Sequence, residues 1–176
     1  MQKLLLHTCC GPCSTAVLEA LTPDYDLTLY FYNPNLDSAE EYTKRLTAQQ
    51  TAAAHAAVEL IAEPYDPNPF TDRTAGLEST PEGGARCTHC FTLRLEQTAK
   101  FAKTHGFDRF TTTLSVSPHK NADLLNQIGT NLAAQHGIPY LPVDFKQKNG
   151  YHRSVAIAKD LKLYRQPYCG CQYSRR

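Results

Sequence analysis

The chain has 176 residues, of which 41% are hydrophobic, and it contains seven cysteines. This length and composition suit one domain with a substantial core, and no apolar run approaches the ~20 residues that would span a bilayer. The apolar run at residues 4–6 is far shorter than the core of a signal peptide. We therefore expect a cytoplasmic protein that makes no membrane contact and keeps its thiols reduced.

The net charge of +1 hides an asymmetry along the chain. Residues 144–176 contain eight lysines and arginines against two aspartates, a net charge of +6, so the preceding residues carry −5. Two interpretations stay open on charge alone. Either an anionic partner contacts this part of the protein, or these residues form an ordinary solvated surface.

Hydrophobic patterning and turn residues predict strands that alternate with helices. The expected strands lie at residues 3–7, 26–32, 58–62, 108–114 and 138–143. The expected helices lie at residues 14–21, 38–57, 88–105, 121–136 and 154–161. Ser38 is expected to begin the second helix and Ser154 the last, as N-cap residues. The segment at 63–86 is polar, with four prolines and three glycines, and is expected to lack regular structure.

This alternation indicates a parallel sheet covered by helices on both faces. We predict a single α/β domain over residues 1–176, a three-layer α/β/α fold with a five-stranded parallel sheet of order 3-2-1-4-5. Its basic, cysteine-containing tail occupies about residues 164–176. Ligands of such sheets bind beyond the carboxyl ends of the strands, near the point where the strand order reverses. That rule places the loop after the first strand at the centre of the site.

All seven cysteines fall into three clusters, and none is scattered. The clusters are Cys9, Cys10 and Cys13; Cys87 and Cys90; and Cys169 and Cys171. The first two clusters lie where helices are expected to begin, and a helix N-terminus favours the thiolate, which binds metals and attacks electrophiles. Cysteines also replace the glycines with which related parallel folds cradle phosphates, so ATP-dependent chemistry is disfavoured.

Spacing alone leaves three kinds of chemistry open. Soft thiolates suit a redox metal centre such as an iron–sulfur cluster. The second possibility is a structural zinc site in an RNA-binding module. Such a site uses four thiols, so three of the seven cysteines would have no role. Cys10-Gly11-Pro12-Cys13, between a strand and a helix, also has the spacing of a thioredoxin-like thiol–disulfide oxidoreductase, although the other clusters then have no role.

The motifs together resemble the QueH-type epoxyqueuosine reductases over essentially the whole chain. The matching blocks include His7-Thr8-Cys9-Cys10-Gly11-Pro12-Cys13-Ser14, Phe31-Tyr32-Asn33-Pro34-Asn35, Tyr65-Asp66, Arg86-Cys87, Cys90-Phe91, Ser117-Pro118, Lys120-Asn121, Asp144-Phe145-Lys146 and Tyr168-Cys169-Gly170-Cys171. The resemblance implies a fold similar to that of adenine-nucleotide α-hydrolases. It also implies the two-electron reduction of epoxyqueuosine to queuosine at the wobble nucleotide of tRNA, without cobalamin.

By the same resemblance, Cys9, Cys10, Cys87 and Cys90 would hold a [4Fe–4S] cluster. Cys169 and Cys171 would form the redox-active pair, which can close to a disulfide. An additional mononuclear iron beside the cluster is associated with the family, and Cys13 and Asp66 are candidates to serve it. The implied partners are tRNA that bears epoxyqueuosine in its anticodon loop and an unidentified low-potential electron donor.

The mechanism expected from this resemblance places the epoxide oxygen on the iron centre and draws electrons through the dithiol, with Asp66 as a proton donor. The alternative for Asp66 is a turn residue that caps its own backbone. Cationic side chains would bind the phosphates of the tRNA, and aromatic side chains would stack on its unstacked bases. The candidates are Lys146, Lys148, Arg153, Arg165 and Tyr168, with His119-Lys120 and Lys44-Arg45 as weaker ones.

Overall fold

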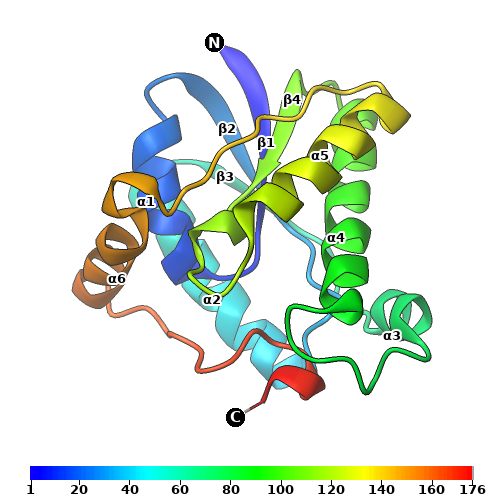
Figure 1. Cartoon of the computed structure of the whole chain (residues 1–176). Helices are drawn as coiled ribbons and strands as arrows, with labels where there is room; N and C mark the ends of the chain where they lie inside the picture. The colour runs from blue at the N-terminus through cyan, green and yellow to red at the C-terminus, as the bar shows by residue number, and fades with distance from the viewer. Residues whose placement is uncertain (176) are drawn as a thin grey trace.

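A computed structural model describes residues 1–175 of the chain, and Arg176, the last residue of the tail, lies outside the described residues. Within that part, four strands form one parallel sheet of order β3-β2-β1-β4 (Figure 1). The strands are β1 (Gln2–Thr8), β2 (Tyr25–Phe31), β3 (Glu59–Ala62) and β4 (Arg109–Thr112). The parallel sheet and the order of these four strands agree with the prediction.

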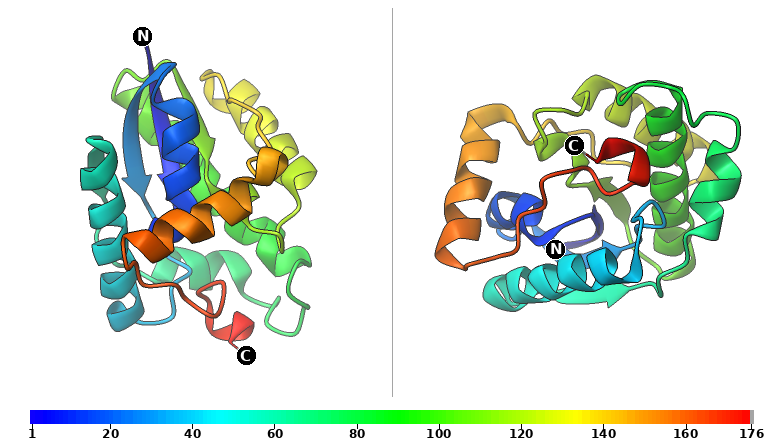
Figure 2. Two further views of the ribbon diagram at one scale, coloured as in Figure 1. Left: turned by 90° about the vertical axis from the view of Figure 1, so that its left-hand side faces the viewer. Right: turned by 90° about the horizontal axis from the view of Figure 1, so that it is seen from below.

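Successive side chains of β1 point to opposite faces of the sheet, as in any strand. Leu5 packs with residues of α4 (Ala85–Thr104) and α5 (Ala122–His136). Leu4 and Leu6 pack on the opposite face, in an apolar cluster that α1 (Gly11–Leu21) and α2 (Ala39–Ala56) help to form. Helix α6 (Gly150–Asp160) packs against α1, which completes the three-layer arrangement visible in Figures 1 and 2.

The fifth strand predicted at residues 138–143 does not form. The segment lies beside β4 but makes only one isolated bridge, between Phe110 and Tyr140. Phe110 N donates to Pro139 O at 3.0 Å and Leu141 N donates to Phe110 O at 2.9 Å. Pro139 and Pro142 have no N–H to donate to a ladder, so pairing stops after this bridge and the sheet keeps four strands.

The helix predictions hold with shifted ends. Ser38 caps α2 as predicted, its Oγ accepting from Glu41 N at 3.1 Å. Helix α6 begins at Gly150, so Ser154, predicted as its N-cap, lies inside the helix and buried. The short helix α3 (Asn68–Thr74) occupies part of the segment predicted to be irregular. Within residues 1–175, no helix is both long enough and apolar enough to cross a membrane.

The carboxyl ends of the strands are held together by His7, which is fully buried. Its Nδ1 lies 3.0 Å from Thr112 Oγ1 of β4, and its Nε2 lies 3.0 Å from the carbonyl oxygen of Tyr32, just after β2. Burial lowers the pKa of His7 to about 3, so the ring is neutral and acts as a structural bridge between three adjacent strands. This is the edge of the sheet from which the first cysteine cluster emerges.

The C-terminal tail (residues 164–175) crosses the same edge, as the view from below in Figure 2 shows. Arg45 of α2, which is only 1% exposed, holds it there. Its Nη1 donates to Cys169 O at 2.8 Å, its Nη2 donates to Tyr168 O at 3.0 Å, and its Nε donates to Glu41 Oε1 at 2.8 Å. Because Tyr164 Oη also donates to Glu41, one buried ion pair fixes the tail at two places.

Gly170 explains how closely the tail approaches α2. Its φ of +133° lies in a region that residues with a side chain rarely adopt. A Cβ at this position would lie 2.7 Å from Leu36 Cδ2 and 3.1 Å from Arg45 Nη1. The glycine between Cys169 and Cys171 therefore lets the chain turn against the guanidinium, so that the two thiols are displayed on a fixed backbone.

We expect Arg45→Met to lower the free energy of unfolding by about 3–5 kcal/mol, because Glu41 and two carbonyl oxygens are left buried without their partner. Urea denaturation measures this loss. Alkylation of Cys169 under native conditions should be faster in the variant, because its backbone is no longer held.

The matched control is Lys44→Met, which breaks the neighbouring i,i+4 pair with Glu40 at 2.8 Å. That pair is solvent-exposed, so the change should leave both the urea midpoint and the alkylation rate of Cys169 close to those of the wild type. Equal effects of the two substitutions would contradict a holding role for Arg45.

Candidate active site

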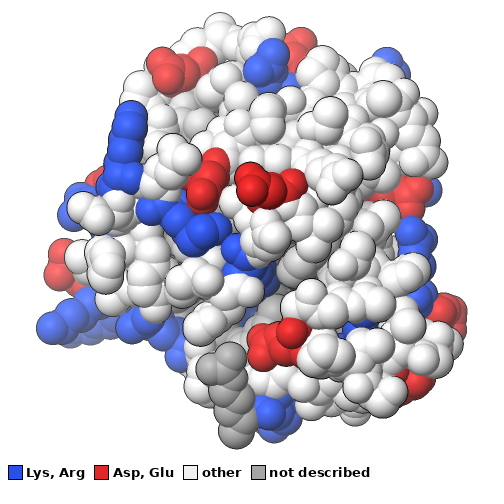
Figure 3. Space-filling model, viewed as in Figure 1, with Lys and Arg blue, Asp and Glu red and all other residues white. Residues whose placement is uncertain are grey.

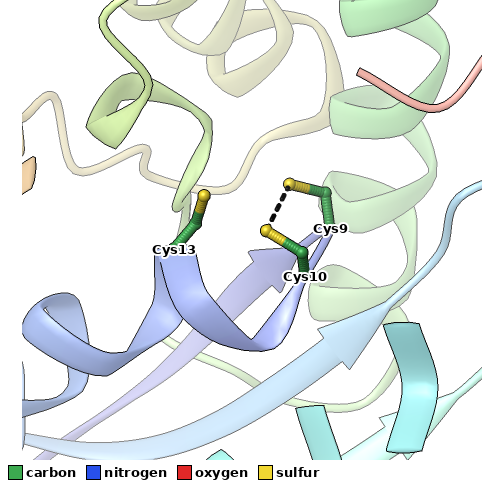
Figure 4. Close-up of side chains that lie close together, drawn as sticks. All are labelled: Cys9, Cys10 and Cys13. Carbon is green, nitrogen blue, oxygen red and sulfur yellow. Dashed lines mark hydrogen bonds between the residues drawn. The ribbon is translucent and has the colours of Figure 1, made fainter. Parts of the chain in front are cut away.

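The first cysteine cluster sits between β1 and α1. Cys9 follows the strand, Cys10 is the N-cap of α1, and Cys13 lies in its first turn. The three sulfur atoms lie within 4.8 Å of one another, with Cys9 Sγ and Cys10 Sγ 3.8 Å apart (Figure 4). Three soft ligand atoms at this spacing form a group that can hold a metal ion.

Of the three thiols, one is favoured to lose its proton. Hydrogen bonds from Cys10 and Cys13 keep the pKa of Cys9 well below its usual value. The pKa of Cys13 is raised well above its usual value, because its proton is held by hydrogen bonds to Cys10 and Cys9. One thiolate stabilised by two thiols is an arrangement prepared to bind a cation.

The other four thiols line a second, small cavity. Cys87 and Cys90 lie in the first two turns of α4, and Cys169 and Cys171 come from the tail. All four line one cavity of about 20 Å³, a space large enough for a single water molecule (the four-thiol cavity). Burial raises the pKa of Cys90 to about 12, so without a cation this thiol stays protonated.

Cys169 connects the two groups. It also lines a larger cavity of about 180 Å³, together with Cys9 and Cys13 (the thiol pocket). Cys87 packs against the same apolar cluster that contains Cys9 and Cys10. The structure thus gathers all three cysteine clusters at the carboxyl edge of the sheet. All seven are free thiols, including the Cys169 and Cys171 pair.

A buried guanidinium lies among these thiols. Arg94 of α4 is 1% exposed; its Nη2 donates to Asn33 Oδ1 at 2.9 Å and its Nη1 lies 3.8 Å from Cys90 Sγ. Its Nε has no hydrogen-bond partner, and it pairs with no carboxylate within residues 1–175. Burial opposes its charge, but Cys90 and Cys9 outweigh that cost and raise the pKa of Arg94. A buried cation of this kind implies an anionic neighbour.

Arg86 and Asn35 complete the surroundings of the four-thiol cavity. Arg86 is 2% exposed, and its Nη1 donates to the carbonyl oxygens of Leu77, Glu78 and Thr80, which orders the loop before α4. Its guanidinium also lies 4.6 Å from the ring centroid of Tyr173 in the tail. The buried Asn35 lines the cavity, and its Oδ1 has no hydrogen-bond partner.

Asp66 lies in the turn between β3 and α3. Its side chain is exposed, and its Oδ1 accepts from Asn68 N at 3.0 Å, which is the turn geometry that the sequence offered as the alternative. It lines neither the thiol pocket nor the four-thiol cavity. Cys13, the other candidate for a second iron, is brought into the cluster.

Only some of the residues predicted to contact tRNA line the thiol pocket. Arg165 and Tyr168 line the thiol pocket. Lys146 uses its ammonium within the protein, donating to the carbonyl oxygens of Ser115 and Lys120 at 2.9 and 3.1 Å. Figure 3 shows Lys and Arg side chains gathering on the side of α6, the helix that carries Arg153.

Two further candidates lie outside the pocket. Arg153 makes an exposed ion pair with Glu19 at 2.6 Å, and Lys148 is exposed in the segment that precedes α6. Neither lines the thiol pocket. Their cationic groups are therefore arranged over the outer surface.

Sequence reasoning did not identify the roles of Arg45 and Arg94. The sequence offers Arg45 only as a weaker candidate for tRNA contact, yet its side chain is buried beneath the tail. The available signal was its i,i+4 spacing from Glu41, which favours an ion pair along the helix. Arg94 lies one helical turn after Cys90, a spacing that places both side chains on one face of α4.

The family model described as epoxyqueuosine reductase QueH matches residues 4–176. The chain is 42% identical to epoxyqueuosine reductase QueH of Staphylococcus epidermidis, over 98% of this chain and 76% of that protein. It is 41% identical to that of Streptococcus pyogenes (99% and 71%) and 32% identical to that of Thermotoga maritima (99% and 91%).

Two solved structures share the fold at low identity. A predicted subunit of tRNA methyltransferase from Methanocaldococcus jannaschii aligns with a TM-score of 0.62 at 13% identity, over 88% of this chain and 75% of that one. The U34-tRNA thiolase NcsA from Methanococcus maripaludis, solved with its [4Fe-4S] cluster, aligns with a TM-score of 0.59 at 14% identity, over 99% and 62%. The sequence matches confirm the resemblance drawn from the motifs: this chain belongs to the epoxyqueuosine reductase QueH family.

Proposed function

We propose that this protein reduces the epoxide of epoxyqueuosine to the alkene of queuosine at the wobble position of tRNA, as the names of its relatives indicate. The observation that carries the proposal is the convergence of Cys9, Cys13 and Cys169 on the wall of one open pocket. Reductive chemistry needs an electron source beside the substrate, and thiols from two remote parts of the chain meet where a nucleotide can enter.

An iron–sulfur cofactor fits the residues present. Thiolates are the ligands that such clusters use, and the buried Arg94, with its unpartnered Nε and no carboxylate partner within residues 1–175, would compensate an anionic group. We propose that Cys9, Cys10, Cys87 and Cys90 hold a [4Fe–4S] cluster, which would pass on the electrons of the dithiol one at a time. An additional iron would have Cys13 beside it, and Asp66 stays a candidate for it, although its side chain lines neither cavity.

The electron and proton balance of epoxide reduction gives the Cys169 and Cys171 pair a role as the reductant. Removing the epoxide oxygen breaks two C–O bonds, forms a C=C bond and releases water, which consumes two electrons and two protons. A dithiol that closes to a disulfide releases two electrons and two protons. Cys169 lines the thiol pocket, and the buried Cys171 lines the adjoining cavity. A low-potential donor then restores the dithiol, and no cobalamin is required.

The tRNA is proposed to approach the mouth of the thiol pocket. Arg165 lines this pocket and is exposed, so its guanidinium can reach a backbone phosphate. Tyr151 supplies an aromatic wall on which an unstacked base can lie, whereas the ring of Tyr168 already lies against the guanidinium groups of Arg45 and Arg175. Because its substrate is tRNA, we propose that the protein works in the cytoplasm.

The decisive experiment is anaerobic purification followed by iron and sulfide analysis, with turnover of tRNA that bears epoxyqueuosine. We expect visible absorbance, iron and acid-labile sulfide in the wild type. Cys171→Ser should keep the iron and abolish turnover, because the dithiol can no longer form a disulfide. Cys9→Ser, the matched control, should lose iron instead.

Zinc or no metal in the wild-type protein would contradict the iron–sulfur proposal and favour an RNA-binding or metal-free thiol function. Normal turnover by Cys171→Ser would remove the dithiol from the mechanism while leaving the activity itself intact.

Affinity for tRNA should fall as salt rises, and Arg165→Gln should reduce the slope of log affinity against log salt by about 1. Fluorescence anisotropy with labelled tRNA over a range of potassium chloride concentrations measures this slope. Lys100→Met, on the exposed side of α4 and paired with Glu96, is the control and should leave the slope unchanged. An unchanged slope for Arg165→Gln would exclude a phosphate contact by this residue.

A further inference from the structure

Lys120 occupies the wall of the thiol pocket, together with Cys9, Cys13 and Cys169. It lies in the turn between the 3₁₀ helix at Leu114–Val116 and α5, and its backbone is fixed. Its N–H donates to Ser117 O at 3.2 Å, and its carbonyl oxygen accepts from Lys146 Nζ at 3.1 Å. The backbone from which this ammonium projects is therefore held on both sides.

Within residues 1–175, the ammonium of Lys120 is not used to hold the structure together. It makes no hydrogen bond and no ion pair with any residue in the described range 1–175. The groups that influence it most are thiols: burial opposes its charge, but Cys169, Cys9 and Cys13 outweigh the burial and raise the pKa of Lys120. A half-buried cation that faces thiols remains charged and has donor capacity to spare.

The two arginines of the thiol pocket are either already bonded within the protein or exposed to solvent. Arg45 is bound to Glu41 and to two carbonyl oxygens of the tail. Arg165 is exposed, so it faces the solvent side from which the tRNA backbone would come. Lys120 is the half-buried cation whose donors remain available to a molecule held against Cys169.

An epoxide reduced in this pocket needs such a donor. As the first C–O bond breaks, negative charge develops on the oxygen, and donors fixed in advance beside that atom lower the barrier. We propose that Lys120 is a catalytic residue whose ammonium donates a hydrogen bond to the epoxide oxygen and stabilises the charge that forms there. This role rests on the function proposed above.

The step balances without a net proton from the lysine. The dithiol supplies both electrons and both protons as it forms a disulfide, the oxygen leaves as water, and Lys120 ends in the protonation state in which it began. Its contribution is electrostatic, so a charged replacement should keep part of it and a neutral one should keep none.

The test compares Lys120→Met and Lys120→Gln, which remove the charge, with Lys120→Arg, which retains it. Three quantities are measured for each: iron and sulfide per chain, affinity for tRNA that bears epoxyqueuosine, and the single-turnover rate of queuosine formation. Lys100→Met, far along α4 and 54% exposed, is the matched control and should match the wild type in all three.

We expect both neutral variants to keep iron content and tRNA affinity within about twofold and to lose about 10²–10³-fold in rate. Lys120→Arg should recover at least about tenfold of that loss. A rate within about fivefold of wild type in the neutral variants would overturn the proposal.

Two other outcomes would also overturn it. Loss of iron in both neutral variants but not in Lys120→Arg would mean that the lysine only compensates the charge of the thiol cluster. Weaker tRNA binding with a reduced salt slope and an unchanged single-turnover rate at saturation would make it a phosphate contact. If the wild-type protein produced no queuosine, the function itself would fail, and that result would be separate from any result on Lys120.

Discussion

Arg45 makes the buried contacts that join the two halves of the site. Its guanidinium bonds Glu41 within α2 and, at the same time, the carbonyl oxygens of Tyr168 and Cys169 in the tail. Asp37 also holds the tail, since its N–H donates to Gly170 O at 3.0 Å and its carboxylate accepts from Tyr168 Oη at 2.8 Å, whereas Arg45 bonds the carbonyl oxygen of Cys169 itself. The cysteine that lines both cavities is thus placed by a contact more than a hundred residues away in sequence.

The charged and polar groups at this edge of the sheet differ from those of a phosphate-binding site. Related parallel folds place glycines and free N–H groups after the first strand. Here that loop carries three thiols, and cations approach them from other elements, Arg94 from α4 and Lys120 from the turn before α5. The arrangement stabilises negative charge on sulfur, which suits electron transfer and soft metals rather than nucleotide hydrolysis.

The strand order and the place of the site could be predicted because both follow from local patterns. Runs such as residues 4–6 identify buried strands, and the parallel alternation then places the following loops on one edge. The fifth strand failed because proline removes the donors that a ladder needs, although the segment still packs beside β4. Helix α3 was missed because prolines and glycines around it obscured any helical period.

The sequence by itself determined which residues are candidates for the proposed chemistry, namely seven cysteines in three clusters, and it gave a family resemblance that the sequence matches confirm. Only the tertiary structure decided how the three clusters meet, with the tail pair beside Cys87 and Cys90 and with Cys169 lining one pocket together with Cys9 and Cys13. The tertiary structure also decided which lysines and arginines bond to other groups of the protein. The reason is that spacing along a chain reports the neighbours within one turn, whereas contacts between remote segments depend on how the helices and the tail pack around the sheet.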